Sequence, residues 1–131
     1  MSEIIQIEKW TNMKVSEIVF DSKKHNWKED KSVFDQLILN KQNLIFLIET
    51  EDNIKFGGFI SSKIDKIRKF ISDENAYVFT FKDNNPMKFD INKYRKYDAF
   101  YLFNKLNYCL FEIGYEDIFI FKHNQKSNIF Q

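Results

Sequence analysis

The amino-acid sequence predicts a mainly β, α+β fold: a two-sheet antiparallel β-sandwich with two or more short helices packed outside. Three observations support this prediction. Short segments rich in β-branched and aromatic residues recur along the chain, polar turns separate them about every 8–12 residues, and no helix-length window follows each segment. A parallel α/β fold is excluded, because it needs long helices that alternate with the strands.

Eight segments have the composition expected of strands. Residues 44–48 form a continuous apolar run, as in a strand covered on both faces. Residues 76–81 place Tyr77, Phe79 and Phe81 on one face, because side chains alternate along a strand. The predicted strands are residues 17–21, 44–48, 54–61, 76–81, 87–91, 98–103, 108–113 and 118–122.

Two short helices are predicted between the strands. Apolar residues at helical spacing predict a helix over residues 32–39. The serine pair 61–62 supplies a cap for a one- or two-turn helix that runs through Ile67. Residues 1–15 show no clear pattern, and we expect Trp10 to dock this arm on the domain.

Composition limits the class of protein. The length of 131 residues fits a single domain, residues 1–131, and the net charge of +1 gives no overall field toward nucleic acid or anionic lipid. No apolar run approaches the roughly 20 residues of a transmembrane helix, and the N-terminus lacks the layout of a signal peptide. We therefore expect an intracellular, cytoplasmic protein without membrane insertion. Abundant Lys, Asn, Ile and Phe, with little Arg, indicate an AT-rich genome.

The usual cofactor and metal motifs do not occur. Gly57 and Gly58 belong to no phosphate-binding glycine pattern, and their place inside a strand predicts a bulge or a close backbone approach. One cysteine and two histidines, without metal-ligand spacing, predict no zinc site. We expect no cofactor, no metal and no nucleophilic triad.

Glu112 is the candidate functional carboxylate. It is an ionisable residue within the apolar stretch 108–113, so it either faces water or needs a partner. An enzyme that uses Glu112, or another carboxylate, in a cleft of the sandwich is one alternative function. A structural or solvated role is the competing interpretation.

Two lysine-rich segments, with aromatic residues among the charges, are the candidate basic patch. If they meet in space, they form a positive face of the kind that binds single-stranded nucleic acid, which is the second alternative function. Acidic residues dilute both segments, and a solvated surface is the competing interpretation. The candidate residues are Lys63, Lys66, Arg68, Lys69, Lys88, Lys93, Arg95 and Lys96.

Several segments together resemble the TLDc domain, over residues 10–131. The run 55–60 contains the family's Phe-Gly-Gly-hydrophobic pattern, residues 75–81 match its aromatic strand, and residues 111–120 match its later strands. The segment 19–22 is similar to protozoan members of the family. The residues that carry the motif are Phe56, Gly57, Gly58, Phe59, Phe79, Phe81 and Gly114.

The resemblance implies a β-sandwich and a noncatalytic role in protein interaction, without an established cofactor. TLDc domains are associated with the response to oxidative stress and with V-ATPase regulation, so V-ATPase subunits are the implied partners. The chain stops at Gln131, where the family continues into a closing strand. A shortened or truncated domain is therefore expected to expose a strand edge near residues 118–122, which would permit a homodimer through that edge.

Overall fold

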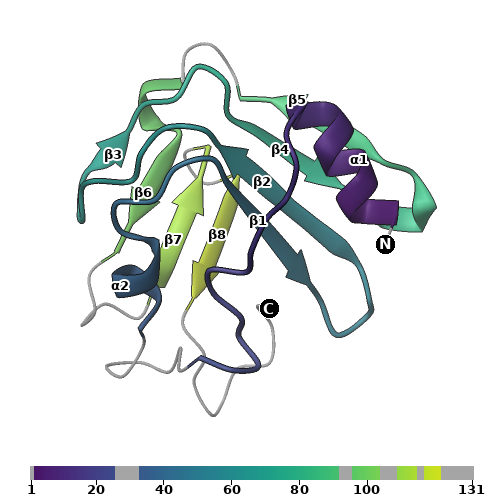
Figure 1. Ribbon diagram of the computed structural model, residues 1–131, viewed down its shortest axis with the longest axis horizontal. Helices are drawn as coiled ribbons and strands as arrows, with labels where there is room; N and C mark the ends of the chain where they lie inside the picture. Colours follow the sequence, from purple (N-terminus) through teal and green to yellow (C-terminus); the bar gives the residue numbers. More distant parts are fainter. Residues whose placement is uncertain (1, 26–32, 92–95, 104–108, 115–116, 122–131) are drawn as a thin grey trace.

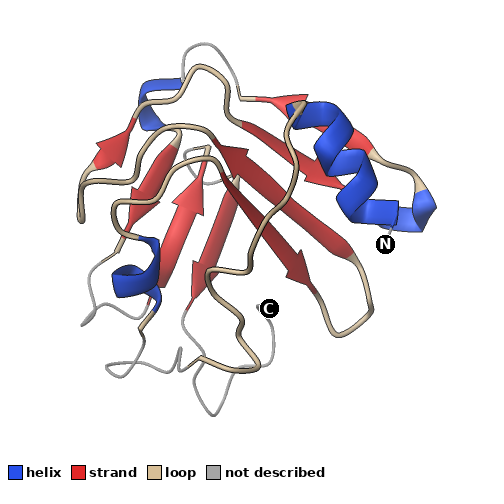
Figure 2. Cartoon of the chain, viewed as in Figure 1, coloured by secondary structure: helices blue, strands red, loops and turns tan. Residues whose placement is uncertain are grey.

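Two four-stranded antiparallel sheets form the framework of the protein (Figures 1 and 2). The structure is a computed structural model that describes residues 2–25, 33–91, 96–103, 109–114 and 117–121. An apolar core joins the two sheets, and short helices lie outside it. The predicted two-sheet antiparallel β-sandwich is confirmed.

The first sheet has the strand order β1-β2-β4-β5. A tight turn joins β1 to β2: Asn53 has a φ of +64°, a left-handed conformation that asparagine tolerates, and the Thr50 amide donates a 2.9 Å hydrogen bond to the Ile54 carbonyl. These strands agree with the predicted ones to within a few residues. They are β1 (Leu44–Glu49), β2 (Lys55–Ile60), β4 (Tyr77–Thr80) and β5 (Met87–Asp90).

The second sheet has the order β3-β6-β7-β8. Its strand β7 is buried along its whole length, because β6 and β8 flank it on both sides. The short strand β3 was not predicted, since two residues carry no periodic signal. The strands are β3 (Phe70–Ile71), β6 (Phe100–Leu102), β7 (Cys109–Ile113) and β8 (Ile118–Phe121).

The main core lies between the inner faces of the two sheets. Phe46 of β1 lies 5.2 Å from Phe100 and 4.8 Å from Phe111, measured between ring centroids. Ile60 and Ile113 are fully buried beside these rings. Because the three rings come from strands of both sheets, their contacts hold the sandwich together.

A ten-residue helix, α1 (Ser2–Thr11), covers the outer face of the first sheet (Figure 1). Its Trp10 ring lies between 5.7 and 6.1 Å from the rings of Tyr77, Phe79 and Phe81. Trp10 therefore docks the N-terminal arm as expected, although the helix itself was not predicted.

The predicted alternation of β4 is confirmed, and its aromatic face packs under α1 and not on the core between the sheets. Tyr77 and Phe79 are 3% and 2% exposed and belong to the small cluster under α1. Phe81 is only half-buried, because it follows the end of β4. Val78 faces the other way and packs on the main core.

Gly57 and Gly58 lie where side chains would not fit. A Cβ atom on Gly57 would collide with the Phe46 carbonyl, and one on Gly58 would come within 2.9 Å of an Ile113 methyl group. Gly114 has a φ of +69°, which favours glycine, at the turn after β7. The glycine pair thus permits close packing within the sheet and between the sheets.

The strand predicted over residues 17–21 is wrong. This segment is an irregular connection in which Val19 and Phe20 pack partly against the main core. Burial of these two apolar residues accounts for the strand-like pattern. However, within the described part of the chain the segment forms no ladder of backbone hydrogen bonds to a neighbouring strand.

The helix predicted after the serine pair 61–62 is also wrong, because tertiary hydrogen bonds replace helical ones. The amide of Ile64 donates to the carbonyl of Lys41, and the amide of Asn40 donates to the carbonyl of Ile64, at 2.8 and 2.6 Å. Arg68 has a φ of +66°, which interrupts any regular helix. The helix predicted over residues 32–39 is present as the five-residue α2 (Phe34–Ile38).

Each sheet has two end strands, and β8 is one of them. This position agrees with the edge predicted near residues 118–122, although Lys122 lies outside the described residues. A homodimer through that edge stays a prediction. Within the described ranges, no helix has the length and hydropathy needed to cross a membrane.

Burial of the Tyr77 hydroxyl gives a pH-dependent prediction. This buried oxygen has no hydrogen-bond partner among the described residues, and burial raises the pKa of Tyr77 from 10.0 to about 12. A raised pKa means that stability is fully present below pH 10 and is lost as the pH rises through 12. Tyr77→Phe should therefore stabilise the protein by about 1 kcal/mol at neutral pH and by roughly 2 kcal/mol more at pH 12.

Urea unfolding of both proteins between neutral pH and pH 12 measures this difference directly. All other ionisable groups are the same in both proteins, so their contributions largely cancel in the comparison. Parallel pH profiles for wild type and Tyr77→Phe would contradict the prediction.

Candidate functional site

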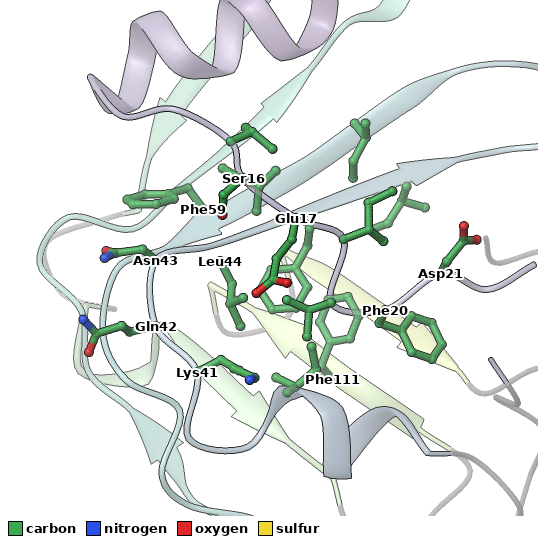
Figure 3. A pocket seen from close by; sticks show the side chains of 18 of the residues that line it. Ser16, Glu17, Phe20, Asp21, Lys41, Gln42, Asn43, Leu44, Phe59 and Phe111 are labelled. Atoms are coloured by element: carbon green, nitrogen blue, oxygen red, sulfur yellow. The ribbon is translucent and has the colours of Figure 1, made fainter. Parts of the chain in front are cut away.

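A cavity of about 660 Å³ lies between β1, α2 and the segment 13–22 (Figure 3). This volume is typical of sites that bind a small molecule or a short stretch of peptide. We call it the β1 crevice. Most of the residues that line it are apolar, and they include Met13, Val15, Ile18, Phe20, Phe34, Ile38, Leu44, Phe46, Leu47 and Phe111.

The floor of the β1 crevice is the border of the main core. Phe34 of α2 stacks on Phe111 of β7 with 5.3 Å between ring centroids, and Phe46 lies against the same Phe111 ring. All three side chains are buried. The floor is therefore fixed by the packing of the sandwich and does not need a ligand to form.

One wall of the crevice is the segment 13–22, which is anchored at its two ends. The Val15 amide donates to a Glu8 carboxylate oxygen at 2.8 Å, and the Asp21 amide donates to His25 Nδ1 at 2.9 Å. Phe20 stacks on His25 with 5.4 Å between centroids. Residues 16–20 between the anchors make no hydrogen bond to any described residue.

The opposite wall is the free edge of β1, the first strand in its sheet. The Thr50 amide donates a hydrogen bond to the Ile54 carbonyl of the neighbouring strand segment. Hydrogen-bonded pairs recur at every second residue of an antiparallel ladder, so the backbone groups of every second residue of β1 face β2. The backbone groups of Ile45, Leu47 and Glu49 are left at the free edge, without a strand partner among the described residues.

Exposed apolar side chains surround the opening. Ile18 is 74% exposed, and Met13, Val15 and Leu47 are also exposed. A soluble protein seldom gathers such residues on one surface unless something else covers them. The crevice is therefore suited to an apolar, extended ligand.

Charged residues of both signs lie at the opening. Glu17 comes from the segment 13–22, and Lys41 comes from the loop between α2 and β1 (Figure 3). Lys14 forms an ion pair with Glu8, with 3.6 Å between Nζ and Oε1. The mixed signs do not favour a strongly charged ligand.

Glu112 lies away from this crevice. It is buried on β7, and its register neighbours are Tyr101 on β6 and Phe119 on β8. It is absent from the crevice lining, and no cluster of three or more potential metal ligands occurs in the described part of the chain. Glu112 therefore takes no part in the β1 crevice.

The two lysine-rich segments are only partly described. Four of the candidates, Lys63, Lys66, Arg68 and Lys69, are exposed on the connection between β2 and β3. Lys88 lies on β5 of the first sheet. Lys88 also pairs with Asp90 and lies 4.9 Å from the Tyr77 ring centroid. The backbone of Lys96 is in a short 3₁₀ helix next to β3, and Lys93 and Arg95 lie outside the described residues.

Sequence reasoning missed the β1 crevice and the helix α1. One signal for the helix was present: Ile4, Ile7 and Thr11 follow the spacing of a helical face, and Ile7 is fully buried. No comparable signal exists for the crevice, because its walls come from segments far apart in the sequence.

Comparison with known proteins gives one match. A family model described as TLDc domain matches residues 1–130. No match was found among curated proteins or among solved structures.

Proposed function

The chain belongs to the TLDc domain family, and we propose that it is a noncatalytic protein-interaction domain that binds its partner in the β1 crevice. The single observation that carries this proposal is the exposed apolar opening beside the free edge of β1. Such an opening provides both contacts that an extended peptide needs, backbone groups on a strand edge and apolar surface for side chains.

The proposed mode of binding is strand addition. A partner segment pairs with the free backbone groups of Ile45, Leu47 and Glu49. Its inward side chains enter the crevice and contact Leu44, Phe46 and Ile18, while those on the other face of the added strand contact Leu47. Residues 16–20 can shift during binding without breaking any hydrogen bond among the described residues.

Family membership supports a more specific proposal. TLDc domains are associated with V-ATPase regulation and with the oxidative-stress response, so the proposed partner is a V-ATPase subunit and the proposed setting is the cytoplasm. A lysine-based interaction with nucleic acid is the weaker alternative, since the described basic residues are divided between the β2–β3 connection, a 3₁₀ helix and strand β5. It predicts affinity that falls steeply with added salt.

Ile18→Lys tests the partner-binding proposal. Ile18 is 74% exposed, so the substitution should leave the fold intact, yet it places a charge in the apolar opening. We expect binding to purified V-ATPase to weaken about tenfold or more, the effect of losing the burial of one apolar side chain. Biolayer interferometry with the detergent-solubilised enzyme measures the affinity.

Ile5→Lys is the matched control, because Ile5 is exposed on α1 and does not line the crevice. It should bind as wild type does. Equal weakening by both substitutions would contradict the crevice as the site, and no V-ATPase binding by wild type would contradict the choice of partner.

A further inference from the structure

Strand β5, at the other end of the first sheet, is a second exposed edge. All four of its residues are exposed, and Phe89 is 49% exposed. Met87 and Phe89 share one face of the strand, and Lys88 and Asp90 share the other. Figure 1 shows this strand at the margin of its sheet, away from β1.

The backbone groups at this edge can be identified. The Ile91 amide donates to the Ala76 carbonyl at 3.3 Å, and Val78 lies opposite Phe89 in the register of β4 and β5. In an antiparallel ladder, bonded pairs recur at every second residue, so Phe89 bonds to β4. The amides and carbonyls of Lys88 and Asp90 therefore face away from the sheet.

The side chains of these two residues have opposite charges and lie close together. Lys88 Nζ is 3.1 Å from Asp90 Oδ1. We propose that β5 pairs antiparallel with β5 of a second copy, with Lys88 opposite Asp90 of that copy and Phe89 opposite Phe89 at the two-fold axis. The first sheets of the two copies then join into one continuous eight-stranded sheet.

Charge selects this register among the two-fold arrangements. Shifting the second copy by two residues either way places Lys88 opposite Lys88 or Asp90 opposite Asp90, and directly opposed like charges are destabilising. With Lys88 opposite Asp90, each lysine has an aspartate across the strand pair as well as within its own strand. The same register aligns the outward backbone groups, which gives four hydrogen bonds.

Apolar contact adds to this pairing. Phe89 meets its symmetry mate in a pair without backbone hydrogen bonds, where opposed side chains approach most closely. Only about four residues a side take part, far fewer than the roughly 20–30 a side of a stable standard interface. We therefore expect a weak dimer that forms at high concentration.

This inference is independent of the proposed partner site, because β5 and β1 lie at opposite ends of the sheet. It also differs from the edge predicted near residues 118–122, which belongs to the second sheet.

Charge-reversal variants test the register. Lys88→Glu leaves two acidic residues on the edge, and Asp90→Lys leaves two lysines. In sedimentation velocity over a concentration series, wild type should show a concentration-dependent dimer, whereas each variant alone should stay monomeric. An equimolar mixture of the two variants should dimerise again, because every cross-strand pair then joins opposite charges.

Dimerisation in the equimolar mixture would also show that both single variants are folded. The double variant Lys88→Glu/Asp90→Lys should self-associate as wild type does, because both pairs are reversed together. Wild type that is monomeric throughout, single variants that dimerise as strongly as wild type, or a mixture that stays monomeric would each overturn the proposal. V-ATPase binding measured on the same variants should not change, which separates this result from a failure of the partner site.

Discussion

Replacing Asp73 with alanine is expected to lower the free energy of unfolding by about 3–5 kcal/mol, because it removes a buried carboxylate that accepts hydrogen bonds from four part-buried donors. Asp73 is 2% exposed. Its Oδ1 accepts from the Ser61 hydroxyl at 2.6 Å and from the Asn75 amide at 2.9 Å. Its Oδ2 accepts from the amides of Ser61 and Ser62.

The position of Asp73 explains why the loss should be large. Ser61 follows β2 of the first sheet, and Asp73 follows β3 of the second sheet, so the carboxylate joins the connections of both sheets. Alanine would leave three amides without their acceptor near the core residue Ile64. Chemical unfolding monitored by tryptophan fluorescence measures the change.

Asp65→Ala is the matched control for Asp73→Ala. Asp65 is an exposed acidic residue on the same connection, and its replacement should change stability by less than about 0.5 kcal/mol. Asp73→Asn should fall between the two, because it keeps one acceptor oxygen but turns an amide donor toward other donors. A loss for Asp73→Ala below about 1 kcal/mol, the contribution of one ordinary hydrogen bond, would contradict this account.

The strands could be predicted from the sequence because each is a local pattern. The apolar run of residues 44–48 lies in β1, and Tyr77 and Phe79 share one face of β4 as expected. The expected cover on both faces of 44–48 is wrong, because β1 is an edge strand and its Leu47 is 42% exposed. The outer cover of the first sheet could not be deduced in this way. Alternation at β4 shows that one face is apolar, but it does not reveal whether α1 or the second sheet covers that face.

The two wrong elements failed because distant residues decide the local conformation. Ser61 and Ser62 have the chemistry of helix caps, yet their amides bind the carboxylate of Asp73. Residues 17–21 have a strand-like composition, but the free edge of β1 across the crevice does not pair with them. Propensity alone does not specify which edge a segment meets.

The candidate site was beyond sequence reasoning for a related reason. Leu47 and Ile18 are ordinary apolar residues in the sequence, and only the fold brings them to one opening. The predicted candidates were chosen for their charge instead. Glu112 proves to be buried between strands, and Lys88 is paired with Asp90.

Phe79→Ala is expected to lower the free energy of unfolding by about 3–5 kcal/mol, the usual cost of removing a buried phenylalanine ring. The Phe79 ring is 2% exposed and lies 5.8 Å from Trp10 and 5.4 Å from Phe81, measured between ring centroids. It also lies over Gly57, which has no side chain to fill the space left behind. Since Trp10 attaches α1 to the sheet, the loss should also loosen this helix.

Two measurements distinguish this effect from a general loss of packing. Phe79→Ala should reduce the helical circular-dichroism signal before the sheets unfold, because α1 rests on the small cluster that contains Ile7 and Phe79 and not on the main core. Phe89→Ala makes the same chemical change at a strand position that is 49% exposed, and at low concentration it should cost less than about 1 kcal/mol. If the two alanine variants were equally stable, or if α1 persisted unchanged in Phe79→Ala up to global unfolding, then Phe79 would not hold the helix on the sheet.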